Sequence, residues 1–212
     1  MKKKLALLGT KDFSQQIIQF ALLTDEYEIF GYFDDIEAAG SIIGQYVVKG
    51  DSDDAIRQYH SGLFDCIFIC IGYTRFDLRE KFYNKFKNVI PLATIISKNA
   101  TIHQSVSIGE GVYIGGGNII GAGCAIGDNV VAMGHSIFGH DNIVGKHTYF
   151  SGGNQLAGFT TIGERCFFGI SSILSDHIRI GNDVWIGLGM IVYRNILKKG
   201  KYMVLQKIVK MD

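Results

Sequence analysis

The sequence has little of several things that would assign it to a particular class of protein. It contains a single proline, Pro91, in 212 residues, and its 21 Lys and Arg side chains nearly balance 20 Asp and Glu. A net charge this small gives no general attraction to nucleic acid or to an acidic membrane. No apolar run approaches the roughly 20 residues of a membrane-spanning helix, so we expect no membrane insertion. Any anionic ligand must be held by local groups.

Metal and disulfide patterns are also missing. The four cysteines, at positions 66, 70, 124 and 166, show no paired zinc spacing. The histidines have no helical or hairpin metal spacing either, so we expect no metal. Buried free thiols are expected, as in a cytoplasmic protein. The opening MKKKLALLG resembles a signal peptide, but its apolar run is only about five residues long, and we interpret it as a first strand.

Glycine, in contrast, is abundant. Most of the 27 glycines lie after residue 100, which indicates that the architecture changes near there. We expect a first domain over residues 1–90 and a second over 91–212, with the change falling at about residues 88–98.

The second part carries a repeat in which every sixth residue is apolar. The repeated positions are Ile102, Ile108, Ile114, Ile120, Ile126, Ala132, Phe138, Val144, Phe150, Leu156, Ile162, Phe168, Leu174, Ile180, Ile186 and Val192. A glycine usually follows each of them. In an α-helix, apolar residues six positions apart would be spread around the whole surface. In short strands, whose side chains alternate between two sides, they all point to the inside. The repeat predicts a parallel β-helix with roughly five coils between residues 102 and 192 and three strands in each coil. An unrelated Gly-rich β-sandwich would not hold so strict a period.

Strands and helices alternate in the first 90 residues. We expect strands at 4–9, 28–35 and 64–72, a possible strand at 46–50, and helices at 12–24, 52–60 and 75–87. This alternation is typical of a parallel sheet covered on both faces. The sequence therefore predicts an α/β, Rossmann-like domain.

Ligands of such sheets bind beyond the carboxyl ends of the strands, where glycine turns admit phosphates and an acid contacts ribose hydroxyls. The candidates here are Gly9, Lys11, Asp34, Asp35 and Gly72. An alternative interpretation is that Lys11, Asp34 and Asp35 are solvated side chains in turns and at strand ends that bind no ligand. The first turn reads G-T-K-D-F rather than G-x-G-x-x-G, which disfavours a dinucleotide cofactor and an oxidoreductase.

Taken together, the Gly9 turn, the FDD acids, the IG pair at 71–72 and the six-residue repeat resemble a family of sugar acyltransferases. This family includes the sialic-acid O-acetyltransferases and the bacillosamine-pathway N-acetyltransferases. Its clearest motif is a His and an acid, then an Ile/Val-Gly pair, then Ala/Ser-Gly about one coil later. The chain has this motif as HDNIVG at 140–145 and AG at 157–158. The resemblance implies a nucleotide-sugar-binding first domain and a left-handed β-helix that binds acetyl-CoA in a homotrimer, with active sites between subunits.

The register of the repeat gives the motif a geometry. His140 falls at a corner, and Gly158 occupies the same corner one coil away, at a strand spacing of about 4.8 Å. An imidazole and a backbone N–H at this separation suit acyl transfer, with His140 as general base and the Gly158 N–H as oxyanion donor. The resemblance implies that Asp141 raises the basicity of His140. His135 and His147 are offset along the coil, so we expect their side chains to point elsewhere.

Further acetyl-CoA contacts are implied by family position alone. They are Tyr149, which stands where the family usually has a second His, the Gly158 N–H, and Ile170 and Leu188. The last two are explained equally well as ordinary coil residues.

We therefore expect acetyl transfer from acetyl-CoA to the amino group of a nucleotide-activated sugar, as in surface-polysaccharide or glycan synthesis. O-acetylation of a sugar hydroxyl would use the same base and oxyanion donor. From another class, a catalytically silent trimeric scaffold or nucleotide-sugar sensor is favoured by the absence of the family's G-x-P-A ending. A basic tail at 198–212 replaces that ending, and its lysines could meet the CoA phosphates.

Overall fold

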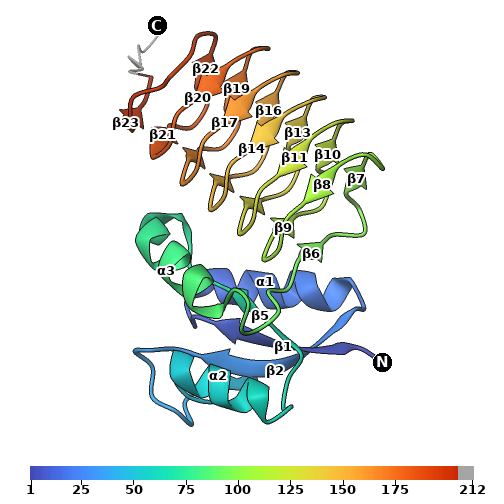
Figure 1. Ribbon diagram of the computed structural model, residues 1–212, viewed down its shortest axis with the longest axis vertical. Helices are drawn as coiled ribbons and strands as arrows, with labels where there is room; N and C mark the ends of the chain where they lie inside the picture. Colours follow the sequence, from blue (N-terminus) through green and yellow to red (C-terminus); the bar gives the residue numbers. More distant parts are fainter. Residues whose placement is uncertain (205–212) are drawn as a thin grey trace, which may run out of the picture.

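The computed structural model describes residues 1–204 and consists of an α/β part with a β-helix stacked on it (Figure 1). Residues 205–212, which include the last two lysines of the basic tail, lie outside the described residues. In the described part no helix is long and apolar enough to span a bilayer.

A three-stranded parallel sheet, in the order β2-β1-β5, forms the centre of the α/β part. Its strands are β1 (Lys3–Leu8), β2 (Tyr27–Phe33) and β5 (Cys66–Ile69). Helix α1 (Asp12–Leu23) lies between the sheet and the β-helix, and α2 (Ser52–His60) lies on the far side of the sheet (Figure 1). The 3₁₀ turn η1 (Tyr73–Arg75) leads into α3 (Phe76–Phe86). The predicted α/β fold is therefore confirmed, with helices on both faces of a parallel sheet.

The possible strand predicted at 46–50 is not a member of this three-stranded sheet. Strand β4 (Tyr46–Val47) pairs antiparallel with β3 (Ile42–Ile43) in a hairpin. A single bridge from Val48 to Tyr32 joins the hairpin to β2. The reason lies in the turn, because Gly44 adopts a φ of 63° and positive φ values suit the tight turns of two-residue hairpins.

Parallel strands eighteen residues apart form the three faces of the β-helix, except that β23 pairs with β21 at a separation of sixteen residues. The first face, which packs on the α/β part, contains β6 (Ile95–Ile96), β9 (Tyr113–Ile114), β12 (Val131–Ala132), β15 (Tyr149–Phe150), β18 (Phe167–Phe168), β21 (Val184–Ile186) and β23 (Gly200–Tyr202). The second face contains β7 (Thr101–Ile102), β10 (Ile119–Ile120), β13 (Ile137–Phe138), β16 (Gln155–Leu156), β19 (Ile173–Leu174) and β22 (Ile191–Val192). The third face contains β8 (Ser107–Ile108), β11 (Ala125–Ile126), β14 (Ile143–Val144), β17 (Thr161–Ile162) and β20 (Arg179–Ile180).

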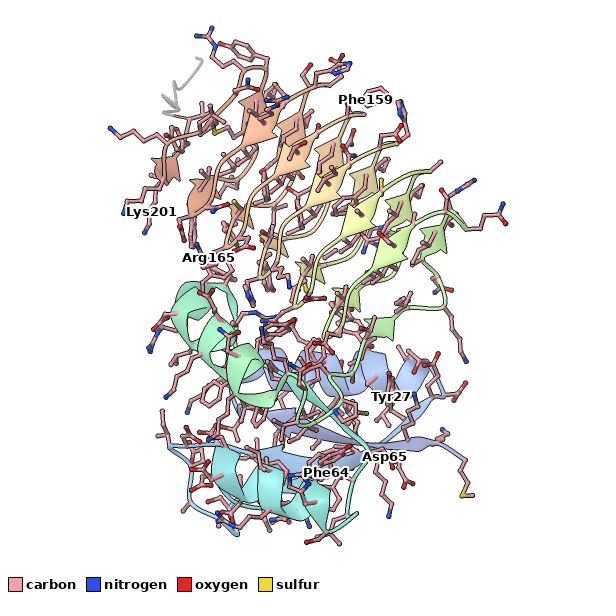
Figure 2. The ribbon with its side chains drawn as sticks, in the orientation of Figure 1. Tyr27, Phe64, Asp65, Phe159, Arg165 and Lys201 are labelled. Atoms are coloured by element: carbon pink, nitrogen blue, oxygen red, sulfur yellow. The ribbon has the colours of Figure 1, made fainter. Side chains whose placement is uncertain are left out.

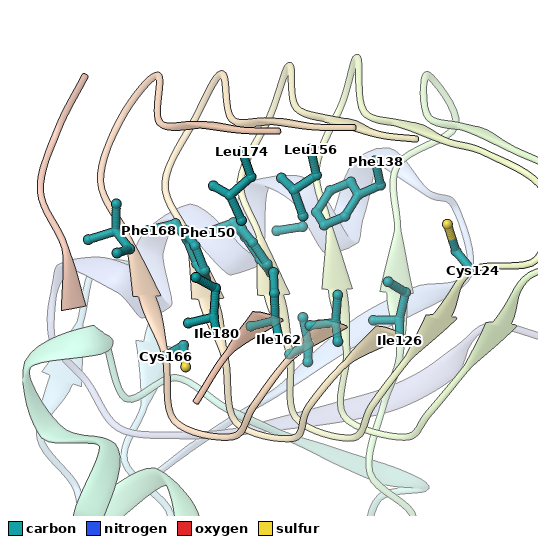
Figure 3. Close-up of a cluster of buried hydrophobic side chains, with 14 of the residues drawn as sticks. Cys124, Ile126, Phe138, Phe150, Leu156, Ile162, Cys166, Phe168, Leu174 and Ile180 are labelled. Atoms are coloured by element: carbon teal, nitrogen blue, oxygen red, sulfur yellow. The ribbon is translucent and has the colours of Figure 1, made fainter. Parts of the chain in front are cut away.

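The apolar column of the repeat fills the interior of the β-helix, as predicted (Figure 3). Phe150 and Phe168 stack with ring centroids 4.7 Å apart, and Cys124 and Cys166 pack among them. Strands β7 to β22 make the roughly five coils expected between residues 102 and 192, and β6 and β23 extend the β-helix beyond this range to about six turns.

The two parts share a buried apolar contact. Outward side chains of the first face, Tyr113 and Tyr149 among them, pack in one cluster with α1. The Phe20 and Tyr113 rings lie 5.4 Å apart. Arg165 of the β-helix, which Figure 2 shows next to α3, approaches Glu80 at 3.2 Å. Each large apolar side chain buried in this way contributes about 1.5–3 kcal/mol, and together these side chains hold the α/β part against the β-helix.

Candidate active site

His140 and Asp141 form a hydrogen-bonded pair at the corner between the second and third faces. The distance from His140 Nδ1 to Asp141 Oδ2 is 2.8 Å, and the side chains are 57% and 49% exposed. Since a carboxylate only accepts hydrogen bonds, this contact assigns the proton to Nδ1 and leaves the lone pair on Nε2. The pair therefore presents a base to a reactant that approaches from solvent.

Gly158 lies directly beside the imidazole, one coil further on. A Cβ atom added to Gly158 would lie 2.7 Å from His140 Nε2, so a side chain at this position would displace the ring. The next residue, Phe159, donates its backbone N–H to the His140 carbonyl oxygen at 3.0 Å. Within residues 1–204 the Gly158 N–H itself forms no hydrogen bond. A base and an available N–H donor therefore meet at one point.

A second feature is a cavity of about 790 Å³ at the carboxyl ends of β1, β2 and β5. Its lining includes all five residues predicted to bind substrate: Gly9, Lys11, Asp34, Asp35 and Gly72. Tyr149 completes it from the β-helix. The structure therefore brings these residues together at the edge where ligands of parallel α/β sheets bind.

The two acids of the cavity have different surroundings. Asp34 Oδ2 accepts hydrogen bonds from the Thr10 hydroxyl at 2.7 Å and the Thr10 N–H at 3.0 Å. Its Oδ1 accepts from the backbone of Ile36 and Glu37. Burial alone would raise the pKa of Asp34, but these hydrogen bonds outweigh it and hold the pKa below its usual range. Asp34 therefore fixes the turn after β1.

Asp35 is the more accessible acid. It is exposed, and its Oδ1 accepts the Ser52 N–H at the start of α2. Lys11 is also exposed and pairs with Glu37 at 3.2 Å on the rim of the cavity. Asp35 is thus the better placed of the two acids to accept a hydrogen bond from a ligand hydroxyl.

The two glycines of the cavity also differ in what they require. Gly9 has a φ of 99°, and an added Cβ would lie 3.3 Å from the Cys70 carbonyl oxygen. An added Cβ on Gly72 would meet nothing within 4 Å. The first turn therefore needs glycine, and the second leaves open space toward a ligand.

Tyr149 lies on the first face and is buried against the α/β part, away from the corner that carries His140. Its ring packs against Phe13, Tyr73 and Phe167, and burial raises its pKa to about 12. Ile170 and Leu188 lie at the corner between the first and second faces and are 61% and 78% exposed. Within one chain, the structure does not bring these three residues together with His140.

The cavity and the base also lie on different sides of the β-helix. Figure 2 shows Phe159, the neighbour of Gly158, on the side of the β-helix far from the α/β part. The cavity lies between the α/β part and the first face. A ligand in this cavity does not face the His140 of the same chain.

Sequence reasoning missed the role of Arg79, a guanidinium that is only 1% exposed. It donates to the carbonyl oxygens of Ile69 and Ile71 at 3.0 and 2.6 Å, and to Asn129 of the β-helix at 3.0 Å. Burial lowers its pKa to about 10. The signal was available, because positions 79, 82, 83 and 86 follow the spacing of one buried helix face. Arg79 fixes the end of β5 that forms one wall of the cavity.

His147 is buried as well. Its Nδ1 lies 2.9 Å from the Asn129 side-chain nitrogen, and burial, followed by the charge of Arg79, lowers its pKa to about 4. It points toward the α/β part and not toward the His140 corner. Among residues 1–204, no three His, Cys, Asp or Glu side chains are grouped as a metal ion would require.

Comparison with known proteins matches both parts of the chain. The family model of the PglD N-terminal domain matches residues 4–86. UDP-3-O-acylglucosamine N-acyltransferase of Bordetella pertussis is 39% identical over 75 residues, which are 35% of this chain and 19% of the relative. The same enzyme of Albidiferax ferrireducens is 35% identical over 75 residues, 35% of this chain and 21% of the relative. The chain thus spans about a fifth of the length of the curated relatives that it matches.

Solved structures match over nearly the whole chain. PerB from Caulobacter crescentus, in complex with CoA and GDP-perosamine, has a TM-score of 0.85 at 25% identity and covers 95% of this chain and 94% of its own. The acetyltransferase domain of PglB from Neisseria gonorrhoeae FA1090, in complex with acetyl coenzyme A, has a TM-score of 0.86 at 23% identity, with coverage of 96% and 97%. At that identity the likeness shows a shared fold. Residues 4–86 are thus similar to the PglD N-terminal domain, and the chain as a whole shares its fold with PerB and with the acetyltransferase domain of PglB.

Proposed function

We propose that the protein transfers the acetyl group of acetyl-CoA to the amino group of a nucleotide-activated amino sugar. The observation that carries this proposal is the corner where His140, oriented by Asp141 at 2.8 Å, lies against Gly158. Both groups that acyl transfer requires, a base and an oxyanion donor, meet there. The likeness to PerB, which holds CoA and GDP-perosamine, supports the choice of substrates.

The chemistry follows from these two groups. The sugar amine attacks the thioester carbonyl carbon while His140 Nε2 takes the amine proton, and the Gly158 N–H donates to the oxyanion that forms. The C–S bond then breaks, the carbonyl re-forms, and His140 returns the proton to the CoA sulfur. A base of this kind contributes about 10²–10⁴-fold, and one oxyanion donor about 10²–10³-fold.

The nucleotide belongs in the cavity at the edge of the sheet. The turn at Gly9 admits a phosphate near the start of α1, where the helix N-terminus favours negative charge, and Asp35 accepts a ribose hydroxyl. Gly72 leaves room for the rest of the ligand. The carboxyl ends of the strands, where this cavity lies, are the usual ligand-binding position in open α/β sheets.

We propose a homotrimer with active sites between subunits. The cavity and His140 lie on different sides of one β-helix, so the sugar must reach a base on another copy. An apolar row on the second face, interrupted by Gln155 of β16, supports this assembly, because exposed apolar side chains gathered on one face are typical of a protein–protein contact. Its members are Ile119, Ile137, Ile173 and Ile191, which are 47%, 42%, 40% and 61% exposed. Ile170 and Leu188 of one subunit would then border the His140 corner of another and line the acetyl-CoA channel.

The cellular setting follows from the thiols. All four cysteines are free and buried, as in proteins of reducing compartments. We propose a cytoplasmic enzyme that modifies sugar precursors of a surface polysaccharide or glycan.

The test measures acetyl-CoA consumption against UDP-, dTDP- and GDP-linked amino sugars, with the corresponding hydroxy sugars alongside. We expect turnover with an amino sugar and a loss of about 10²–10⁴-fold in His140→Ala. His103→Ala is the matched control, an exposed histidine on the same edge of the β-helix. Turnover with hydroxy sugars alone would assign O-acetylation. Absence of CoA binding by calorimetry would leave the scaffold hypothesis.

Subunit mixing tests the shared site. Neither His140→Ala nor Leu188→Glu is expected to be active alone, and Leu188 is 78% exposed, so its substitution is compatible with folding. Co-assembly of the two variants restores wild-type sites if each site combines two subunits. No recovery in mixed trimers of confirmed composition would contradict a shared site.

A further inference from the structure

Phe159, which directly follows Gly158, has an unusual backbone. Its φ is 57°, in the left-handed region, which is unfavourable for a bulky L-residue. The other non-glycine residues with positive φ in residues 1–204 are Asp, Asn, His, Arg or Ser. Phe159 is the only wholly apolar side chain among them. A strained position of this kind is a reason to search for a function.

Burial does not explain the strain, because the Phe159 side chain is 48% exposed. Its contacts are instead two histidine rings. The His140 imidazole lies 4.8 Å away at an interplanar angle of 89°, and the His177 imidazole lies 4.8 Å away at 13°. Phe159 therefore contacts two rings, the perpendicular imidazole of His140 and the stacked imidazole of His177.

His140 needs such a support. Its side chain is 57% exposed, and the one side-chain hydrogen bond that it forms within residues 1–204, to Asp141, restrains only Nδ1. The Nε2 edge would otherwise be free to swing away from Gly158. A perpendicular aromatic contact is a favoured geometry, and the Phe159 ring, 4.8 Å from the imidazole, makes this contact on one side of His140.

We propose that Phe159 is a positioning residue for the base: it holds the His140 imidazole over Gly158, and His177 holds Phe159 from behind. This inference rests on the proposed acetyl transfer. It assigns the left-handed phenylalanine a role in orienting Nε2 toward the reacting amine. Misplacing a catalytic group by about 1 Å can cost about 10²-fold, so a loss of even part of this support is measurable.

Phe159→Asn is the decisive variant, because asparagine suits the left-handed backbone and has no ring. We expect kcat to fall about tenfold or more, which corresponds to about 1.4 kcal/mol, while KM for acetyl-CoA changes less than twofold. Tm should stay level or rise by about 2–4 °C as strain is relieved. Phe159→Tyr keeps the ring and should retain kcat.

Two further variants control for folding and for a general effect. His135→Asn removes an aromatic ring from another left-handed corner, with a φ of 64°, and should leave kcat unchanged. His177→Asn removes only the ring behind Phe159 and should lower kcat by a smaller factor. A Phe159→Asn variant that keeps wild-type kcat, or that loses kcat and Tm together, would overturn the proposal.

An NMR measurement on labelled histidine separates this inference from the proposed function. In the wild type, the Phe159 ring current shifts the His140 ring protons, which His140→Ala identifies by their absence. We expect Phe159→Asn to move these resonances even if no sugar is acetylated, in which case positioning stands and the proposed reaction fails. Resonances that do not move would overturn the positioning role.

Discussion

The space between Gly158 and His140 is too small for any side chain. An added Cβ would lie 2.7 Å from both Nε2 and Cε1 of the imidazole, about 1 Å closer than the 3.5–4.0 Å at which non-bonded atoms attract. The exposed imidazole can move, whereas the coil backbone is held by the strands on both sides. Gly158→Ala should therefore displace His140 rather than the coil.

The consequences for activity and stability have opposite signs. A displacement of about 1 Å costs about 10²-fold in rate, so we expect kcat to fall by at least that factor. The φ of Gly158 lies outside the left-handed region, so alanine is compatible with the backbone. Substitution at such a site adds about 0.4–1 kcal/mol of stability by restricting the unfolded chain.

The assay compares kcat and the urea-unfolding free energy of Gly158→Ala with those of Gly116→Ala. An added Cβ on Gly116 would approach nothing closer than the Ser97 hydroxyl at 3.3 Å, so this matched variant should retain kcat. Wild-type kcat in Gly158→Ala would refute the assignment of His140 and Gly158 to one site. A loss of stability equal to the loss of activity would refute the argument that the ring, and not the coil, gives way.

Three other substitutions test the surroundings of the site. Asparagine fits the local φ of 55° at position 141, so Asp141→Asn removes only the charge that stabilises the imidazolium. We expect kcat to fall about 10–10²-fold with KM unchanged. A kcat equal to that of the wild type in steady-state assays would contradict a role for the carboxylate. The pKa of His147 is about 4 in the folded protein and 6.5 in its ordinary, unfolded state. Between pH 6.5 and pH 4, His147 therefore binds a proton in the unfolded protein but not in the folded one. The free energy of unfolding of the wild type should therefore fall by about 3 kcal/mol over that range. That of His147→Asn should fall by less, as measured by denaturant titrations at several pH values. Parallel pH profiles of the two proteins would argue against a neutral His147. Arg79→Met leaves the carbonyl oxygens of Ile69 and Ile71 without their donor. The free energy of unfolding, measured in urea, should fall by about 3 kcal/mol. An unchanged free energy of unfolding would show that water replaces the guanidinium.

The β-helix could be predicted because its constraint is local and repeated. Each inward position must be apolar, and the count from Ile102 reproduced every strand from β7 to β22. The count began one repeat too late, although Ile96 already fits the register. The corner of His140 and Gly158 followed from the same arithmetic, since residues eighteen apart pair in neighbouring coils.

The rest depended on contacts between distant segments. The sequence placed Asp34 at a strand end but did not reveal that Thr10, 24 residues away, takes up one of its oxygens. Position 149 had to point outward, yet nothing in the repeat says which outer face the α/β part covers. The left-handed backbone of Phe159 was also hidden, because a phenylalanine gives no signal for that conformation.

We propose that acetyl transfer occurs at the His140 corner and uses residues of two subunits. A crystal structure with acetyl-CoA and a nucleotide-linked amino sugar tests it most directly. We expect the thioester oxygen about 2.7–3.1 Å from the Gly158 nitrogen and the sugar amine about 2.6–3.2 Å from His140 Nε2, with the nucleotide in the cavity of another subunit. A thioester bound beside Tyr149, with no reactant at His140, would contradict the claim.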